Sequence, residues 1–407
     1  MRATSQRAER LLDLLNILLS DVRYGLGAYL GVYLLSEHGW SEAAIGVAIT
    51  IGGLAGLASA TPMGALVDRV SDKRWLIAGA ALVVTASCLL IPIVPTFWPV
   101  VAAGVVGSVA GTVFAPSILS MSLGMVGHGR FPARAGRNEA MFHAGNAACN
   151  ALVLAAAFVW GSAVVFWVLA GTALGSVFAA LAIPREAVDP ELARDAPATL
   201  RRSGSKWPVL LANPPLLIFA ACGALFHLAN GAMLGLVGQK LAHVAPGYGI
   251  ALTAACAIMA QSVMVPVALY AGSRTNTIGR KPLLVAAFVA LAMRGLFCAL
   301  SDQPASYVLV QILDGIGAGL TGALIPVVIA DLTRGSGHFG LAQAGIGTLQ
   351  GVGGALSSTL AGLIVSNAGY GPAFLTLTVI AGAGLLVFMA VMPETAHFEP
   401  DRAAARA

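Results

Sequence analysis

The stretch Gly64-Ala-Leu-Val-Asp68-Arg69-Val-Ser-Asp-Lys73-Arg74 is a charged turn between two long apolar runs, and it decides the fold. A partial second copy begins at position 272 and reads Gly272-Ser-Arg-Thr-Asn276-Thr-Ile-Gly279-Arg280-Lys281. In both places an apolar run ends near a glycine, a polar turn with basic residues follows, and a second apolar run begins. This repetition predicts a membrane protein built from two similar halves.

The composition places most of the chain in lipid. Of the 407 residues, 58% are hydrophobic and only 10% are charged, whereas soluble domains carry about 25% charged residues. The five cysteines all fall inside apolar runs without the spacing of metal ligands. We therefore expect no metal site and no cofactor. The net charge of +5 does not indicate a nucleic-acid partner, because the basic residues gather in the turns between apolar runs.

The apolar runs predict twelve membrane-spanning helices, since one span needs about 20 mostly apolar residues. The predicted ranges are 11–35, 42–66, 75–94, 97–121, 138–160, 163–183, 213–237, 249–271, 282–300, 305–330, 340–366 and 372–392.

The positive-inside rule tests this count, because cytoplasmic turns retain Lys and Arg. With both termini in the cytoplasm, all but three of the 23 basic residues fall in cytoplasmic segments; the exceptions are Arg23, Lys240 and Arg294. This asymmetry predicts a multi-pass protein of the plasma membrane, of the bacterial inner-membrane type. We expect a six-helix bundle over 1–183, a cytoplasmic linker over 184–208, a second bundle over 209–395 and a cytoplasmic tail over 396–407.

The two charged turns resemble motif A of the major facilitator superfamily, which follows the second and eighth helices of those transporters. In the first copy Ser71 and Asp72 depart from the family pattern, and in the second Asn276 and Thr277 do. The matching residues are Gly64, Asp68, Arg69 and Lys73 in the first copy, and Gly272, Gly279, Arg280 and Lys281 in the second.

The resemblance implies an all-α fold of two pseudo-symmetric six-helix bundles that rock about a central site. It also implies a gating latch, in which Asp68 meets the start of the eleventh helix while the site faces outward. A carboxylate is favoured at a helix N-terminus. The alternative is a turn that only sets topology. With Asn276 in place of the aspartate, the second latch is expected to be weaker.

The first helix carries Asp21, Arg23 and Tyr24 at membrane depth. Ionisable groups there are costly and are functional candidates. Asp21 and Arg23 point about 200° apart on a helix, so they cannot face one direction. Asp21 is a candidate proton carrier or cation ligand, and Arg23 a candidate anion ligand. The alternative is a structural ion pair between helices.

The fifth helix carries a polar face. Glu139, His143, Asn146 and Asn150 recur at i, i+4, i+7 and i+11. Histidine is the side chain whose ordinary charge change falls near physiological pH, so this face, which contains His143, is predicted to handle substrate or protons. The alternative is hydrogen bonding between helices.

The second half offers further candidates in the helices that line the cavity of family members. They are His227 and Asn230 in the seventh helix, Gln311 and Asp314 in the tenth, and Gln350 in the eleventh. Arg294, in the ninth helix, is expected to pair with Asp302 or with a lipid headgroup.

These features predict a secondary active transporter, not an enzyme, working by alternating access with protons as the coupling ion. Its partners would be a small-molecule substrate, protons and the lipid bilayer, and we expect a monomer. Export of a drug or metabolite is the first hypothesis. Drug–proton antiporters of the superfamily often carry a Gly-Pro motif in the fifth helix and an arginine in the fourth, and this chain has neither. These absences, together with Arg23 at membrane depth and the histidines, favour the alternative, uptake of a small organic anion. A membrane sensor is a remote third alternative.

Overall fold

The computed structural model describes residues 2–23, 26–189, 213–333 and 339–396, which form helices and turns without a strand. Eleven of its helices are long and apolar enough to cross a membrane. The predicted linker lies mostly outside the described residues; a short 3-10 helix, Arg185–Ala187, marks its start.

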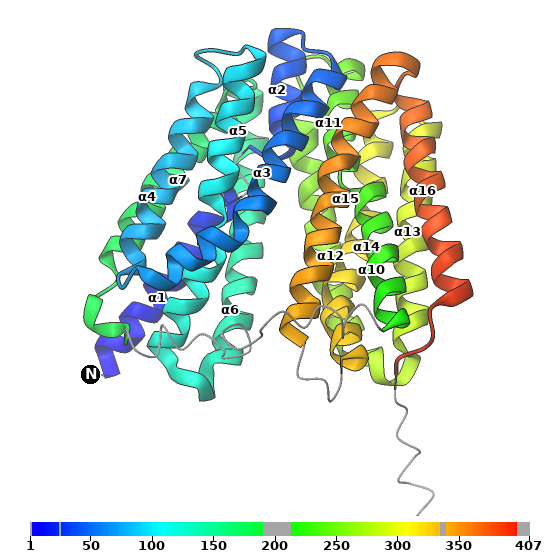
Figure 1. Cartoon of the computed structure of the whole chain (residues 1–407). Coiled ribbons are helices and arrows are strands. Elements are labelled where there is room, and N and C mark those ends of the chain that lie inside the picture. The colour runs from blue at the N-terminus through cyan, green and yellow to red at the C-terminus, as the bar shows by residue number, and fades with distance from the viewer. Residues whose placement is uncertain (1, 24–25, 190–212, 334–338, 397–407) are drawn as a thin grey trace, which may run out of the picture.

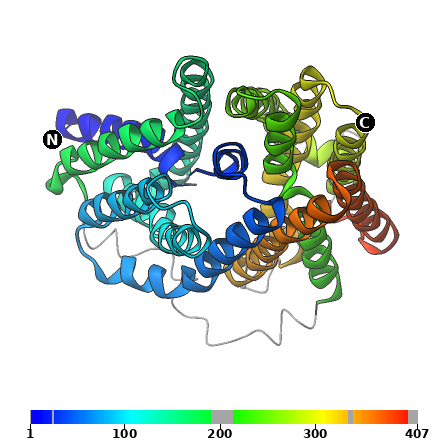
Figure 2. The same ribbon diagram turned by 90° about the horizontal axis from the view of Figure 1, so that it is seen from above.

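The helices fall into two bundles that stand side by side (Figures 1 and 2). The first bundle contains α1 (Arg2–Val22), α2 (Ala28–His38), α3 (Glu42–Arg69), α4 (Lys73–Leu90), α5 (Phe97–Gly111), α6 (Phe114–Trp160) and α7 (Val164–Ala182). The second contains α10 (Pro214–Asn230), α11 (Met233–Val244), α12 (Gly249–Ile278), α13 (Arg280–Leu300), α14 (Pro304–Leu332), α15 (Phe339–Ala368) and α16 (Tyr370–Val391). Helix α6 contains a sharp turn at Gly127, where φ is 68°, so it covers the end of the fourth predicted span and the whole fifth.

One predicted helix is broken near its middle. The first predicted helix divides into α1 and α2, with Gly27 at φ 48° before α2. The seventh keeps helical dihedral angles at Gly231 and Ala232, between α10 and α11, and forms one span, Pro214–Val244. The expectation of a continuous helix was therefore wrong for the first predicted helix. Irregular backbone is tolerated at membrane depth where it is buried in protein, and the broken ends are covered by neighbouring helices.

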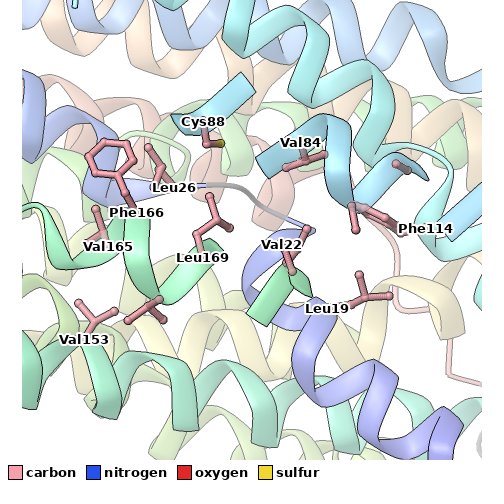
Figure 3. Close-up of a cluster of buried hydrophobic side chains, with 14 of the residues drawn as sticks. Leu19, Val22, Leu26, Val84, Cys88, Phe114, Val153, Val165, Phe166 and Leu169 are labelled. Atoms are coloured by element: carbon pink, nitrogen blue, oxygen red, sulfur yellow. The ribbon is translucent and has the colours of Figure 1, made fainter. Parts of the chain in front are cut away.

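Each half has its own buried apolar cluster. Figure 3 shows part of the first, in which Leu19, Val22 and Leu26 pack near Cys88 and Leu169 around the break in the first helix. This cluster draws on residues 12–183 with three additions from α12, whereas the second is built from residues 216–392. The break is therefore held inside the first half by apolar packing.

The N-terminal end of α1 lies at one face, named the near side, and α2 lies toward the opposite face, named the far side (Figure 1). Toward the far side, α3 packs tightly on α15. A Cβ at Gly46 would overlap the Ser358 carbonyl, and one at Gly362 would overlap the Glu42 carbonyl. The Thr50 hydroxyl donates to the Ala355 carbonyl at 2.6 Å. In the described part of the chain, the hydrogen bonds between the halves lie from the far ends to the middle of the helices, so the far side is closed.

Candidate functional site

The predicted polar face of α6 meets the second half near the middle of the membrane. Asn146 accepts a hydrogen bond from Gln261 of α12 at 3.3 Å. Asn150 donates to the Asn146 carbonyl at 2.7 Å and accepts a hydrogen bond from the Tyr29 hydroxyl of α2. The Gln261 carbonyl oxygen is buried without a hydrogen-bond partner in the described structure. This part of the face lies at the boundary between the halves.

The same face continues toward the near side through His143 to Glu139. The Nδ1 atom of His143 is buried, and it has no hydrogen-bond partner among the described residues. Glu139 is exposed. Buried polar groups without partners cost about 1–3 kcal/mol each, so His143 is a site where a ligand or a proton would be accommodated.

His227 of α10 and Gln350 of α15 both lie close to Gly223 of α10. The His227 Nδ1 atom lies 3.0 Å from the Gly223 carbonyl. A Cβ at Gly223 would lie 2.8 Å from the Gln350 side-chain nitrogen, which is itself buried without a hydrogen-bond partner in the described structure. Gly223 thus leaves room for the Gln350 amide against α10.

Arg294 is the centre of a polar cluster inside the second half. Its guanidinium donates to Asp314 at 2.6 Å, to Asn230 at 2.8 Å and to Gln311 at 2.7 Å, and it is 1% exposed. The expected pairing with Asp302 was wrong: Asp302 lies 2.7 Å from Lys240. A fully buried guanidinium needs a charge partner, and Asp314 provides it.

Asp21 and Arg23 diverge, as their spacing predicts. Asp21 accepts a long hydrogen bond, 3.4 Å, from Thr172 of α7. The Arg23 guanidinium lies 5.0 Å from the centre of the Phe142 ring of α6. In the described part of the chain, the salt bridges do not include Asp21. Tyr24, the third candidate of this helix, lies outside the described residues.

A buried network near the near side of the first half did not figure among the candidates. Arg134 donates to Asp13 at 2.5 Å and to Asn138 at 2.7 Å, and Arg137 donates to Asp13 at 2.7 Å. Asn138 in turn donates to Ser122 at 2.8 Å. Asp13 and Arg134 are each charged residues beside an apolar run, which is the signal that could have identified them.

The first motif copy forms a compact turn. The Lys73 ammonium donates to the Val67 and Val70 carbonyls, and Arg74 donates to Asp72 at 2.6 Å. Gly64 and Gly272, in contrast, face open space. Arg69 is exposed, and the side chains of Asp68 and Asn276 lie outside the described structure, so the latch stays a prediction.

The second copy is tied to the ends of two other helices. Arg280 donates to Asp331 at 3.0 Å, at the end of α14. The backbone N–H groups of Arg280 and Lys281 donate to Glu394 at 2.9 and 3.0 Å. Gly279 adopts a φ of 99° between α12 and α13, which favours glycine.

A titratable cluster joins the halves at the far side. Glu42 of α3 accepts a hydrogen bond from the Tyr370 hydroxyl at 2.8 Å, and its other close neighbour is His243 at 3.4 Å. Lys240 lies over the Tyr370 ring at 5.6 Å. Groups of three or more potential metal ligands are absent from the described residues.

The Major Facilitator Superfamily model matches residues 12–274 and 243–407 of the chain. The chain belongs to the major facilitator superfamily. An uncharacterized MFS-type transporter of Mycobacterium tuberculosis strain H37Rv is 46% identical over 396 residues, 97% of this chain and 95% of the relative. The counterpart in strain CDC 1551 matches equally well. This superfamily member is therefore a membrane transporter with the predicted all-α fold.

Solved structures of the superfamily share the fold at low sequence identity. A mutant of the nucleoside transporter NupG is 16% identical with a TM-score of 0.78, covering 95% of this chain and 100% of that one. A D-xylose–proton symporter is 13% identical with a TM-score of 0.70, covering 96% and 98%. A bacterial homolog of the human lysosomal transporter Spinster, inward-facing and unoccupied, is 12% identical with a TM-score of 0.70, covering 98% and 96%.

Proposed function

We propose that this superfamily member is a proton-coupled antiporter that exports a small organic molecule by alternating access. The observation that carries the proposal is a set of buried polar atoms on α6, α12 and α15 that have no hydrogen-bond partner among the described residues. They are His143 Nδ1, the Gln261 carbonyl oxygen and the Gln350 side-chain nitrogen. Each would regain a hydrogen bond from a substrate that carries donors and acceptors.

The packing of the halves supports alternating access. The contacts between α3 and α15 close the far side through small residues and a few hydrogen bonds, such as Thr359 to Thr50 at 2.8 Å. Contacts of this kind can separate without exposing a large apolar core. Asp68, at the opposite end of α3, would supply the alternative latch when the near side closes.

Four residues are proposed to carry protons: Asp21, Glu139, His143 and Asp314. They differ in their surroundings. Asp314 forms a salt bridge with Arg294 at 2.6 Å, whereas among the described residues Asp21 has the one long contact with Thr172. We therefore place the transported proton first on Asp21 and second on His143.

Proton movement in inside-out vesicles tests this function. A pH gradient is imposed, and lipophilic cations, antibiotics and organic anions are added one at a time. We expect at least one compound to dissipate the gradient with the wild-type protein and not with Asp21→Asn. If no compound responds, or if Asp21→Asn and His143→Ala both respond like the wild type, the proposed coupling is wrong.

Uptake of a small organic anion is the second candidate. It is favoured by the position of Arg23 over the Phe142 ring, one residue from His143 on α6, because an arginine near a histidine attracts anions. The same library is then tested as uptake in right-side-out vesicles. Accumulation of an anion that Arg23→Gln abolishes would place this candidate ahead of export.

The near side is proposed to face the cytoplasm of a bacterial cell, with both termini there and the protein in the inner membrane as a monomer. The basic turns Arg69 to Arg74 and Arg274 to Lys281 lie at that side, in agreement with the positive-inside rule. Labelling a cysteine at Thr96, an exposed residue of the far side, with an impermeant reagent on intact cells tests the orientation.

A further inference from the structure

A cavity lies between the two halves, from the start of α3 to the break between α1 and α2. Its volume is about 310 Å³, and its walls come from α2, α3, α11 and α15. Two of its glycines confirm the free space, because a Cβ at Gly27 or Gly235 would meet no described atom within 4 Å. Helices α2 and α11 lie at the far side (Figure 1), so we name this space the far-side cavity.

The two long walls of the far-side cavity are single helix faces, one from each half. On α3 the lining residues recur at i, i+3, i+4 and i+7, which places them on one face. They are Glu42, Ile45, Gly46 and Ile49. The second half shows the same spacing at the start of α11, in the residues Ala232, Gly235, Leu236 and Gln239. At 1.5 Å per residue each face is about 10 Å long, so a compact ligand between them would contact both halves.

Each wall presents an oxygen atom that can accept a hydrogen bond. The contacts of Glu42 with Tyr370 and His243 both use its Oε1 atom, and within the described residues its Oε2 atom makes no hydrogen bond. Gln239 is 5% exposed, and its Oε1 atom is buried without a hydrogen-bond partner in the described structure. The nitrogen of the same amide lies against Gly31 of α2, where a Cβ would come within 2.6 Å. The cavity therefore has one charged and one neutral acceptor, on opposite halves.

The charges around the far-side cavity favour a positive ligand. Glu42 is the one charged residue in its described lining. Lys240, which follows Gln239 on α11, is paired with Asp302 at 2.7 Å. Apart from Glu42, Gln239 and the Ser358 hydroxyl, the described lining consists of glycine and apolar side chains. A ligand with a cationic donor group and a small apolar body matches this surface.

We propose that the far-side cavity binds a small organic amine in its ammonium form. The ammonium would donate to Glu42 Oε2 and to Gln239 Oε1, a charge-assisted and a neutral hydrogen bond, and its hydrocarbon body would lie against Ile45 and Ile49. A bare metal ion fits less well. Calcium takes about six to eight oxygen ligands, whereas the side-chain oxygens in the described lining come from Glu42, Gln239 and Ser358 alone.

The position of the cavity gives the amine an effect on the far side. The α3 wall belongs to the first half and the α11 wall to the second, so both acceptors meet one ligand only while the far side is closed. A ligand that binds one state shifts the population toward that state. The amine would therefore hold the far side closed and slow transport. This inference goes beyond the proposed function, because it assigns a regulatory ligand and not the transported molecule.

The binding test uses the full-length protein in nanodiscs without a pH gradient. The probe is radiolabelled benzylamine, and benzyl alcohol, which has a similar shape and no charge, is the competitor. We expect saturable binding of the amine that the alcohol does not displace. Gln239→Leu should weaken binding about tenfold and leaves the contacts of Glu42 with Tyr370 and His243 in place.

A second variant fills the far-side cavity. Gly235→Leu should abolish binding, because the new side chain occupies the space that the amine needs. Gly79→Leu is the matched control and should bind like the wild type. A Cβ at Gly79 also meets no described atom within 4 Å, but Gly79 is an exposed residue of α4.

The effect on the far side is measured with spin labels at Thr96 and Gln303, exposed far-side residues of opposite halves. Saturating benzylamine should lower the population that is open at the far side in the wild type. It should leave the distance distribution of Gly235→Leu unchanged, because that variant has no room for the amine.

Three results would overturn the inference. Displacement by benzyl alcohol at equal concentration would show that charge does not select the ligand. Wild-type binding in both Gln239→Leu and Gly235→Leu would place the amine outside the far-side cavity. Binding with an unchanged distance distribution in the wild type would remove its effect on the far side. The proposed export is judged separately by proton movement in vesicles, so either hypothesis can fail while the other stands.

Discussion

The mid-membrane carboxylates of the two halves, Asp21 and Asp314, have different contacts. In the second half Asp314 is paired with Arg294 at 2.6 Å, and Asn230 and Gln311 share the same guanidinium. In the first half, among the residues that the structure describes, Asp21 accepts one long hydrogen bond, from Thr172. The comparison shows that two similar bundles can surround a membrane-embedded carboxylate with different partners. The paired cluster is suited to hold helices together, whereas the carboxylate without a basic partner is suited to exchange protons or cations.

Breaking the Arg294 cluster should have the largest effect. Arg294→Met leaves Asp314, Asn230 and Gln311 without their shared donor, and loss of one partner of a buried pair costs about 3–5 kcal/mol. Unfolding in detergent should show this loss of stability, and adding Asp314→Asn should recover part of it. The control is Lys240→Met, which breaks a pair whose Asp302 side chain is 80% exposed and should cost at most about 1 kcal/mol. Equal effects of the two single variants would contradict a structural role for the cluster.

Asp21→Asn should give the opposite profile. Because the Asp21 carboxylate forms no salt bridge with any described residue, the free energy of unfolding should change by less than about 1 kcal/mol, while proton-coupled transport should fall at least tenfold. Unfolding in detergent and proton movement in vesicles are measured on the same preparations. A stability loss as large as that of Arg294→Met would show that the two carboxylates do not differ in the way proposed.

The far-side cluster should respond moderately to Glu42→Gln. A hydrogen bond to a charged group contributes about 1.5–3 kcal/mol, and this one joins the halves, so its loss should raise the population open at the far side about tenfold. Spin labels at Thr96 and Gln303, exposed far-side residues of opposite halves, report the separation. Glu37→Gln is the control, because Glu37 bonds Ser162 within the same half. An unchanged distance distribution in Glu42→Gln would remove this cluster from the gate.

Substitutions in the near-side turns should have the smallest effect on stability. The Arg74 guanidinium beside Asp72 lowers the pKa of that carboxyl. For Glu394, partial burial alone would raise the pKa, but the backbone N–H groups of Ala396, Arg280 and Lys281 outweigh it and lower the pKa.

Because the pKa of Asp72 is lower in the folded protein, its ionised carboxylate stabilises the fold at pH values above the unfolded-state pKa, which is about 3.9 for Asp. This stabilisation is lost as the pH falls through the folded-state pKa. Asp72→Asn should thus lower the free energy of unfolding by about 0.5–1 kcal/mol between pH 5 and 7. Below about pH 4 the variant and the wild type should become equally stable. A gap that stays constant to pH 3 would contradict the assignment to Asp72.

The sequence predicted the bounds of a helix to within a few residues where the length of the apolar run sets them. The ranges 282–300 and 372–392 compare with α13, Arg280–Leu300, and α16, Tyr370–Val391. Hydrophobic length accounts for this, since lipid demands it. The break before Ala28 was not predicted, because glycines such as those beside it also occur within continuous helices of this chain. The opposed directions of Asp21 and Arg23 were predicted from helical periodicity alone.

The sequence by itself determined the membrane location, the family and the faces of each helix that carry polar groups, because these follow from composition and spacing along one chain. Only the tertiary structure decided which faces meet. Arg294 pairs with Asp314 and not Asp302, Asp13 holds Arg134 and Arg137, and Asp21 turns toward Thr172. The reason is physical: the period of a helix gives the relative angles of its side chains, but its rotation about its own axis is set by packing against neighbours distant in the sequence.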